Sequence, residues 1–199
     1  DRKQLAEGLH PAQQRLALEE LLAHNLSMQK LRQLHQSRTG PKMPPVKGLE
    51  GRFLQSLPFS LTGAQQRVCR EIASDLGKDR PMLRLVHGDV GSGKTVVAAI
   101  ACLRAADNGF QTAITAPTEL LAEQHLRVFT GWLKPLGIQP VWLSGKVTGK
   151  RREEALKKIS EGVEVVIGTH ALMQKGVEFQ NLGLVIVDEQ HRFGVGQRM

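Results

Sequence analysis

A glycine-rich segment at residues 88–95 constrains the fold of this chain more than any other feature of its sequence. The segment reads Gly-Asp-Val-Gly-Ser-Gly-Lys-Thr and fits the pattern G-x-x-x-x-G-K-S/T. An apolar run at residues 82–86 precedes it, and a helical stretch at residues 95–106 follows it. This order predicts a buried strand, a tight loop and a helix, which together begin a parallel α/β sheet.

The residue types in this loop predict that it binds the phosphates of ATP. Glycines allow the backbone to wrap closely, so that successive amides and the start of the following helix face the phosphates. Lys94 is expected to neutralise the terminal phosphates, and the Thr95 hydroxyl to ligate Mg²⁺. The expected nucleotide-binding residues of the loop are Gly88, Asp89, Val90, Gly91, Ser92, Gly93, Lys94 and Thr95.

Beyond the loop, short apolar runs alternate with helical stretches, which predicts an α/β fold with a parallel sheet covered by helices. The pattern does not specify the order of the strands in the sheet. The expected strands lie at residues 82–86, 112–115, 141–143, 163–167 and 184–187, and the expected helices at residues 95–106, 119–133 and 151–160.

The first part of the chain has a different pattern. From Pro11 to about Arg38, leucines recur at three- and four-residue steps, which predicts a long amphipathic helix. The proline-rich run at residues 40–45 cannot continue a helix and predicts a linker. We therefore expect a helical linker segment at residues 1–50, with its leucine stripe packed on a neighbouring domain, and an α/β domain at residues 51–199. Within that domain, Thr62 is expected to cap a further helix.

Two acidic residues, Asp188 and Glu189, follow the last expected strand. The carboxyl end of a strand in a parallel sheet is where ligands bind in open α/β folds, so Asp188 is expected to hold Mg²⁺. Glu189 is the better candidate for positioning or deprotonating the attacking water, because hydrolysis requires a carboxylate beside the γ-phosphate. With Lys94, these two acids are the expected catalytic residues.

The formal net charge of +8 is spread along the chain, since residues 1–60 and 61–199 each contribute +4. Charge alone therefore does not identify nucleic acid as the partner. A denser basic stretch fits either a phosphate-binding face or a solvated helix surface; it comprises Lys146, Lys150, Arg151, Arg152, Lys157 and Lys158.

Other compositional features exclude several classes of protein. The two cysteines, and the histidines His125, His170 and His191, lack the paired spacing of a metal site, so zinc is not expected. No window approaches 18 consecutive apolar residues, so we expect no membrane segment and a cytoplasmic protein.

Several motifs together resemble those of the superfamily 2 DNA helicases. The Asp-Glu-x-His form appears at residues 188–191, and the segments at residues 61–65, 116–125 and 168–170 are similar to three further motifs of that family. The resemblance implies a RecA-like motor domain that uses ATP and Mg²⁺. It also implies that Gln65 bonds the adenine edge, and that Thr118 and Thr169 contact the phosphates of DNA.

Three blocks have amino-acid sequences similar to those of the superfamily 2 helicases that remodel stalled replication forks. They lie at residues 57–65, 88–95 and 188–195. The transcription-repair coupling translocase has similar blocks. This resemblance implies branched or forked DNA as the partner. It also implies a junction-binding wedge domain and a second motor domain of the same chain, neither of which lies within the 199 residues.

Three functions remain open from the sequence. The first is a DNA translocase motor driven by ATP hydrolysis. The second is a small-molecule kinase with the same phosphate-binding loop, which would leave the blocks at residues 116–125 and 188–191 unexplained. The third is a nucleotide-binding module that is inactive without its partner domain.

Overall fold

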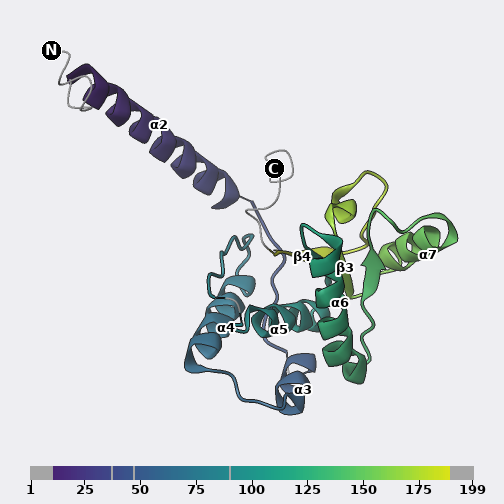
Figure 1. Cartoon of the computed structure of the whole chain (residues 1–199). Helices are drawn as coiled ribbons and strands as arrows, with labels where there is room; N and C mark the ends of the chain where they lie inside the picture. The colour runs from purple at the N-terminus through teal and green to yellow at the C-terminus, as the bar shows by residue number, and fades with distance from the viewer. Residues whose placement is uncertain (1–10, 37, 47, 90, 189–199) are drawn as a thin grey trace. The chain divides into compact units, whose positions relative to one another are not determined.

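The computed structural model describes residues 11–36, 38–46, 48–89 and 91–188 (Figure 1). The chain divides into two compact units. The first unit comprises residues 1–41 and 78–82, and the second comprises residues 42–77 and 83–199.

The first unit contains one long helix, α2 (Pro11–Gln36), which confirms the helix expected from the leucine periodicity. Proline suits the first helical position because its missing amide would have no partner there. The described leucines of α2 are all more than half exposed: Leu16, Leu18, Leu21, Leu22 and Leu26. In the same unit, the amide of Gly40 donates to the carbonyl of Asp79 at 2.9 Å.

The second unit is built on a parallel sheet, as the alternating pattern predicts. Its described strands are β1 (Gln111–Thr115), β2 (Val141–Leu143), β3 (Val165–Gly168) and β4 (Leu182–Val187). They pair in the order β2-β3-β1-β4. All three pairings are parallel, and parallel strands must be joined by crossover connections, usually helices, as in a β-α-β fold.

Helices surround this sheet. They are α3 (Leu49–Ser56), α4 (Gly63–Leu76), α5 (Lys94–Asp107), α6 (Glu119–Leu133) and α7 (Gly149–Ser160), with short 3-10 helices at Lys134–Leu136 and His170–Met173. Helix α5 contacts β1, β4, α3 and α4, and it is buried along most of its length. Thr62 caps α4 as predicted, in a capping box with Gln65.

The strand predicted at residues 82–86 is wrong. All five residues are described and none is in a strand, and the side chains of Leu83 and Leu85 are 84% and 79% exposed. Within this run, Arg84 is bound by two carboxylates of α4, Glu71 at 2.6 Å and Asp75 at 2.5 Å. These partners raise the pKa of Arg84, chiefly through the hydrogen bond that its guanidinium donates to Asp75. An apolar run forms a strand only when a neighbouring strand supplies its hydrogen bonds, and here the segment is bound to a helix instead.

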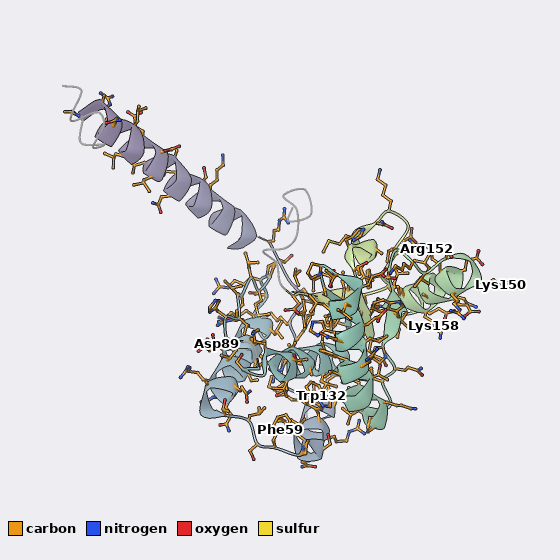
Figure 2. The ribbon with its side chains drawn as sticks, viewed as in Figure 1. Phe59, Asp89, Trp132, Lys150, Arg152 and Lys158 are labelled. Atoms are coloured by element: carbon orange, nitrogen blue, oxygen red, sulfur yellow. The ribbon has the colours of Figure 1, made fainter. Side chains whose placement is uncertain are left out.

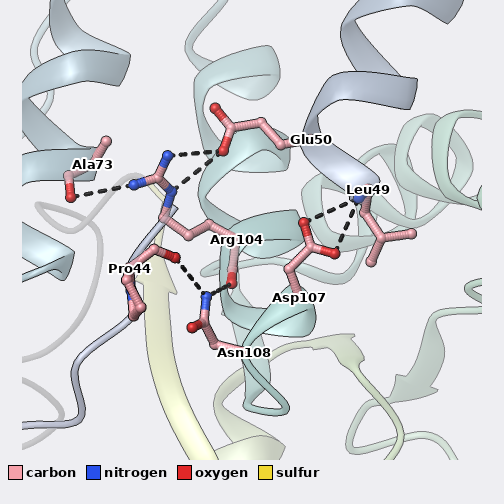
Figure 3. Close-up of polar contacts among 7 residues, drawn as sticks. All are labelled: Pro44, Leu49, Glu50, Ala73, Arg104, Asp107 and Asn108. Carbon is pink, nitrogen blue, oxygen red and sulfur yellow. Dashed lines mark hydrogen bonds and ion pairs between the residues drawn. The ribbon is translucent and has the colours of Figure 1, made fainter. Parts of the chain in front are cut away.

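A buried polar cluster joins α3 to α5 (Figure 3). The guanidinium of Arg104 donates to Glu50 at 2.9 Å and to the carbonyl of Ala73 at 3.3 Å. Both oxygens of Asp107 accept from the amide of Leu49 at 3.0 Å, at the start of α3. The cluster fixes the position of α3 on the helix that carries the glycine-rich loop at its start.

Candidate nucleotide and DNA site

The glycine-rich loop is closed around the side chain of Lys94. Its ammonium donates to the carbonyls of Gly88 at 2.6 Å and Asp89 at 2.8 Å. Gly91 and Gly93 have φ angles of +82° and +80°, which favour glycine because a Cβ would be strained there. The helix that the sequence predicts after this loop is present, whereas the strand predicted before it is not, and Val90 lies outside the described residues.

Helix α5 begins immediately after this loop, at Lys94. Its N-cap residue is Gly93, which has no side chain to accept from the first amides of the helix. Unpaired amides at a helix start carry partial positive charge and attract phosphate. The loop and the helix start therefore have the chemistry to hold an anion, with the full positive charge supplied by Lys94, and that they bind phosphate stays a prediction.

Gln65 lies against this loop. Its Nε2 donates to the carbonyl of Ser92 at 3.0 Å, while its Oε1 accepts from the amide of Thr62 at 2.8 Å. A Cβ on Gly93 would clash with Gln65 Nε2. Each polar atom of an amide side chain has capacity for a second hydrogen bond, so these contacts are compatible with binding a base as well. That Gln65 reads adenine stays a prediction.

A shallow cavity of about 490 Å³ lies beside the capped start of α4. Phe59, which the sequence leaves undecided between base stacking and packing, is 47% exposed and lines this cavity (Figure 2). The remaining lining residues are Leu54, Leu57, Pro58, Ser60, Leu61 and Gln66. An exposed aromatic ring in a partly apolar hollow is a suitable surface for a flat base.

Asp188 lies where the sequence predicts, at the carboxyl end of β4. Its amide donates to the carbonyl of Thr115, the last residue of β1, at 2.9 Å. Its carboxylate Oδ2 lies 2.7 Å from Nε2 of His125 on α6. The sequence singled out His125 only as a histidine without metal-site spacing and did not predict this contact, since no spacing rule connects residues 63 positions apart in the chain. Glu189, Gln190 and His191 lie outside the described residues.

The two residues predicted to hold Mg²⁺ are of types that suit this ion. Thr95 offers a hydroxyl at the start of α5 and Asp188 offers a carboxylate, and Mg²⁺ binds through a few oxygen ligands together with phosphate oxygens and water. Among the described residues, no group of three or more His, Cys, Asp or Glu side chains is placed to hold a metal by itself. The residue types therefore fit a magnesium ion that arrives with a nucleotide.

The two predicted DNA contacts differ in exposure. Thr118 is exposed and caps α6, and its hydroxyl accepts from the amide of Leu121 at 3.3 Å. Thr169 is only 3% exposed, and its amide donates to the carbonyl of Leu143 at 3.4 Å. Gly168 precedes it at a close approach of β3 to β2, where a Cβ would overlap the carbonyl of Leu143. The roles of both threonines stay predictions.

One lysine, Lys146, lies at the start of α6. Lys146 forms an ion pair with Glu119, in the first turn of α6. The side-chain hydrogen bond from Lys146 lowers the pKa of Glu119, and the same bond raises the pKa of Lys146. Helix α7 follows shortly after Lys146, and its residues Lys150 and Lys158 are exposed (Figure 2). A phosphate backbone at the exposed Thr118 would therefore lie close to at least one lysine.

The sequence of the chain also places it in a family. A family model described as "DEAD/DEAH box helicase" matches residues 62–199. The chain belongs to the DEAD/DEAH box helicase family. The matched residues include the loop that contains Lys94, both threonines and Asp188, which confirms the resemblance to superfamily 2 helicases.

Individual members of this family are similar to the chain over nearly its whole length. The chain is 59% identical to the ATP-dependent DNA helicase RecG of Haemophilus influenzae over 196 residues and 55% identical to RecG of Escherichia coli strain K12. Both alignments cover 98% of this chain, but the chain spans only 28% of either relative.

None of the described helices is long and apolar enough to cross a membrane.

Solved structures agree with this similarity. A structure described as RecG bound to a three-way DNA junction matches 91% of this chain with a TM-score of 0.82 and 47% identity, and the match covers 25% of that protein. A hypothetical ATP-dependent RNA helicase from Sulfolobus tokodaii matches with a TM-score of 0.54 and 17% identity, which supports the fold alone.

Proposed function

We propose that this chain contains the first motor domain of an ATP-dependent DNA helicase that acts on branched DNA. The observation that carries the proposal is the 47% identity and TM-score of 0.82 to RecG bound to a three-way DNA junction. In this proposal, residues 51–199 form the motor domain and residues 1–50 connect it to a wedge domain of the same protein. A second motor domain completes the ATP cleft, and the protein acts in the cytoplasm on forked DNA.

In the proposed site, ATP binds with its phosphates in the glycine-rich loop. Lys94 has two carbonyl partners, Gly88 and Asp89, and would exchange them for the terminal phosphates. Gln65, the residue predicted to bond adenine, donates to the carbonyl of Ser92 in the loop. Movement of the loop on nucleotide binding would therefore also move Gln65.

Thr95 and Asp188 would hold Mg²⁺, which neutralises charge on the phosphate oxygens when it is bound. Glu189 would orient and deprotonate the attacking water. The position of Asp188 at the end of β4 supports its role, because the carboxyl ends of parallel strands are where open α/β folds bind ligands.

DNA would be held through its phosphates rather than its bases. Thr118 is exposed at the amino end of α6, where backbone amides and a hydroxyl favour a phosphate oxygen. Thr169, on the neighbouring strand end, is the second proposed contact. Lysines near these residues add non-specific attraction, which suits a motor that moves along DNA of any sequence.

A second candidate is a nucleotide-binding module without turnover of its own. The observation that favours it is that the chain spans only 28% of the curated relatives that it matches. In this view, the chain binds and releases nucleotide, and hydrolysis requires groups supplied from elsewhere in the protein. The family match disfavours the small-molecule kinase, since it includes the helicase blocks that a kinase would leave unexplained.

The test of the proposed nucleotide site is the substitution Lys94→Ala, with Lys134→Ala as a control for the loss of an exposed lysine elsewhere. Calorimetric titration with ATP and Mg²⁺ is expected to detect binding to the wild type and the control. Lys94→Ala should weaken binding at least 100-fold, since contacts with charged groups contribute about 1.5–3 kcal/mol each. Equal affinity for all three proteins would refute the nucleotide site.

A further inference from the structure

The side chain of His125 on α6 contacts the side chain of Asp188 at the end of β4. Nε2 of His125 lies 2.7 Å from Oδ2 of Asp188, although the residues are 63 positions apart. An ionised carboxylate can only accept hydrogen bonds, so the imidazole nitrogen is the donor. A donor at this distance from a carboxylate forms a strong and directional bond.

The ring of His125 is itself held in place. It packs edge-to-face on Phe129, with ring centroids 6.4 Å apart and planes at 76°. Phe129 is 1% exposed and packs in turn against Trp132, which contacts Phe53 of α3. The imidazole is therefore backed by an aromatic cluster, and its orientation does not depend on the carboxylate alone.

The backbone of Asp188 is also fixed, by the hydrogen bond from its amide to Thr115. With the backbone fixed, the direction of the carboxylate depends on its two side-chain torsions. A bond to Oδ2 from a ring that is packed from behind restrains both torsions. A carboxylate oriented in advance loses less conformational freedom when it binds a cation than one that rotates freely.

The pair of His125 and Asp188 contributes little to the stability of the fold. The side chains of His125 and Asp188 are 18% and 33% exposed. Partly exposed ion pairs contribute little to stability. The pair lies at the ligand-binding edge of the sheet, between the helix that begins at Thr118 and the residue assigned to Mg²⁺.

We infer that His125 is a positioning residue that orients the Asp188 carboxylate to receive the magnesium of a bound nucleotide. The inference rests on the proposed assignment of Asp188 as a magnesium ligand. His125 does not touch the nucleotide or the cation. It acts through Asp188, in the way that outer residues orient the ligands of many metal sites.

The test measures metal binding rather than turnover. Mn²⁺ is titrated into the ADP-bound chain and followed by electron paramagnetic resonance, and ADP affinity is measured separately in EDTA. His125→Ala removes the donor, and His125→Gln replaces it with an amide of similar reach. Val128→Ala, on an exposed position of the same helix, is the matched control.

His125→Ala is expected to weaken Mn²⁺ binding roughly tenfold, as loss of an outer-shell partner commonly does, without changing ADP affinity in EDTA. His125→Gln and Val128→Ala should remain close to the wild type. If His125→Ala does not fold by circular dichroism, His125→Phe keeps the packing on Phe129 and still removes the donor, and the same loss is expected.

Two results would overturn the inference. The first is wild-type Mn²⁺ affinity in the variant that lacks the donor. The second is an equal loss in His125→Gln, which would assign the effect to the ring rather than to its hydrogen bond. In the Asp188→Asn background, His125→Ala should cause no further loss. If the wild type itself binds ADP without any dependence on the cation, the proposed function fails instead.

Discussion

The polar cluster that joins α3 to α5 predicts that the substitution Glu50→Ala strongly lowers the stability of the second unit. Arg104 and Glu50 have side chains that are 9% and 25% exposed, and their ion pair joins α5 to α3 (Figure 3). Glu50→Ala leaves the guanidinium nearly buried, with Ala73 as the remaining acceptor among the contacts described above. We expect this substitution to destabilise the second unit.

The size of the expected loss in free energy of unfolding follows from how deeply Arg104 and Glu50 are buried. Removing one partner of a fully buried ion pair costs about 3–5 kcal/mol, because the other charge is left without compensation. Glu50 is partly exposed, so water can reach the site that it vacates, and the carbonyl of Ala73 still accepts one bond. Both features lower the cost, and we expect about 2–3 kcal/mol, since partial hydration reduces the penalty for an unpaired charge.

Urea unfolding followed by tryptophan fluorescence is the appropriate assay. Trp132 lies 5.7 Å from Phe53, centroid to centroid, so its emission reports on the contact between α6 and α3. The expected loss corresponds to a decrease in the urea midpoint of about 1 M. The matched control is Glu161→Ala, whose ion pair with Lys157 spans 3.7 Å at an exposed site. The control should change the free energy of unfolding by less than about 0.5 kcal/mol.

The reasoning would be refuted if Glu50→Ala and Glu161→Ala shifted the midpoint equally. That result would mean that the Arg104 guanidinium is solvated and does not depend on its carboxylate. Glu50→Ala combined with Arg104→Met should recover part of the loss, because the double variant leaves no charge unpaired. The account would also be contradicted if the double variant lost more free energy of unfolding than the two single variants lose in sum.

The remaining predictions concern DNA, catalysis and pH. Binding of this chain to a three-way DNA junction should weaken steeply as salt rises and should not depend on base sequence, and a fluorescence titration with affinity unchanged by salt would point to base contacts instead. The 199-residue chain alone should hydrolyse ATP very slowly, because an arginine acting across the cleft contributes about 10³–10⁵ in rate in related enzymes and the resembling family supplies it from the second motor domain. Phosphate release stimulated by DNA to the rate of a chain extended through that domain would disprove this. Burial raises the pKa of Cys102 from its usual 9.0 to about 12, so the folded state keeps a proton that the unfolded state releases. Cys102 should therefore lower the free energy of unfolding by up to about 1.4 kcal/mol per pH unit between pH 9 and about 12, and Cys102→Ala should make the decrease between pH 9 and pH 10 in urea unfolding smaller than in the wild type.

The sequence by itself determined the features that depend on neighbours along the chain. The glycine-rich loop closes on Lys94 through carbonyls five and six residues away, and Thr62 caps its helix through an amide three residues on. The helices and four of the expected strands were confirmed for the same reason, since the spacing of apolar residues along a helix and the short apolar run of a buried strand are both local patterns.

Only the tertiary structure decided the rest. The apolar run at residues 82–86 met the pattern of a strand, yet Arg84 within it is bound by Glu71 and Asp75 of α4. The strand order, the contact of Gln65 with Ser92 and the bond of His125 to Asp188 each join distant parts of the chain. Such pairings depend on which surfaces meet when the helices pack on the sheet, and no local pattern of residues encodes that choice.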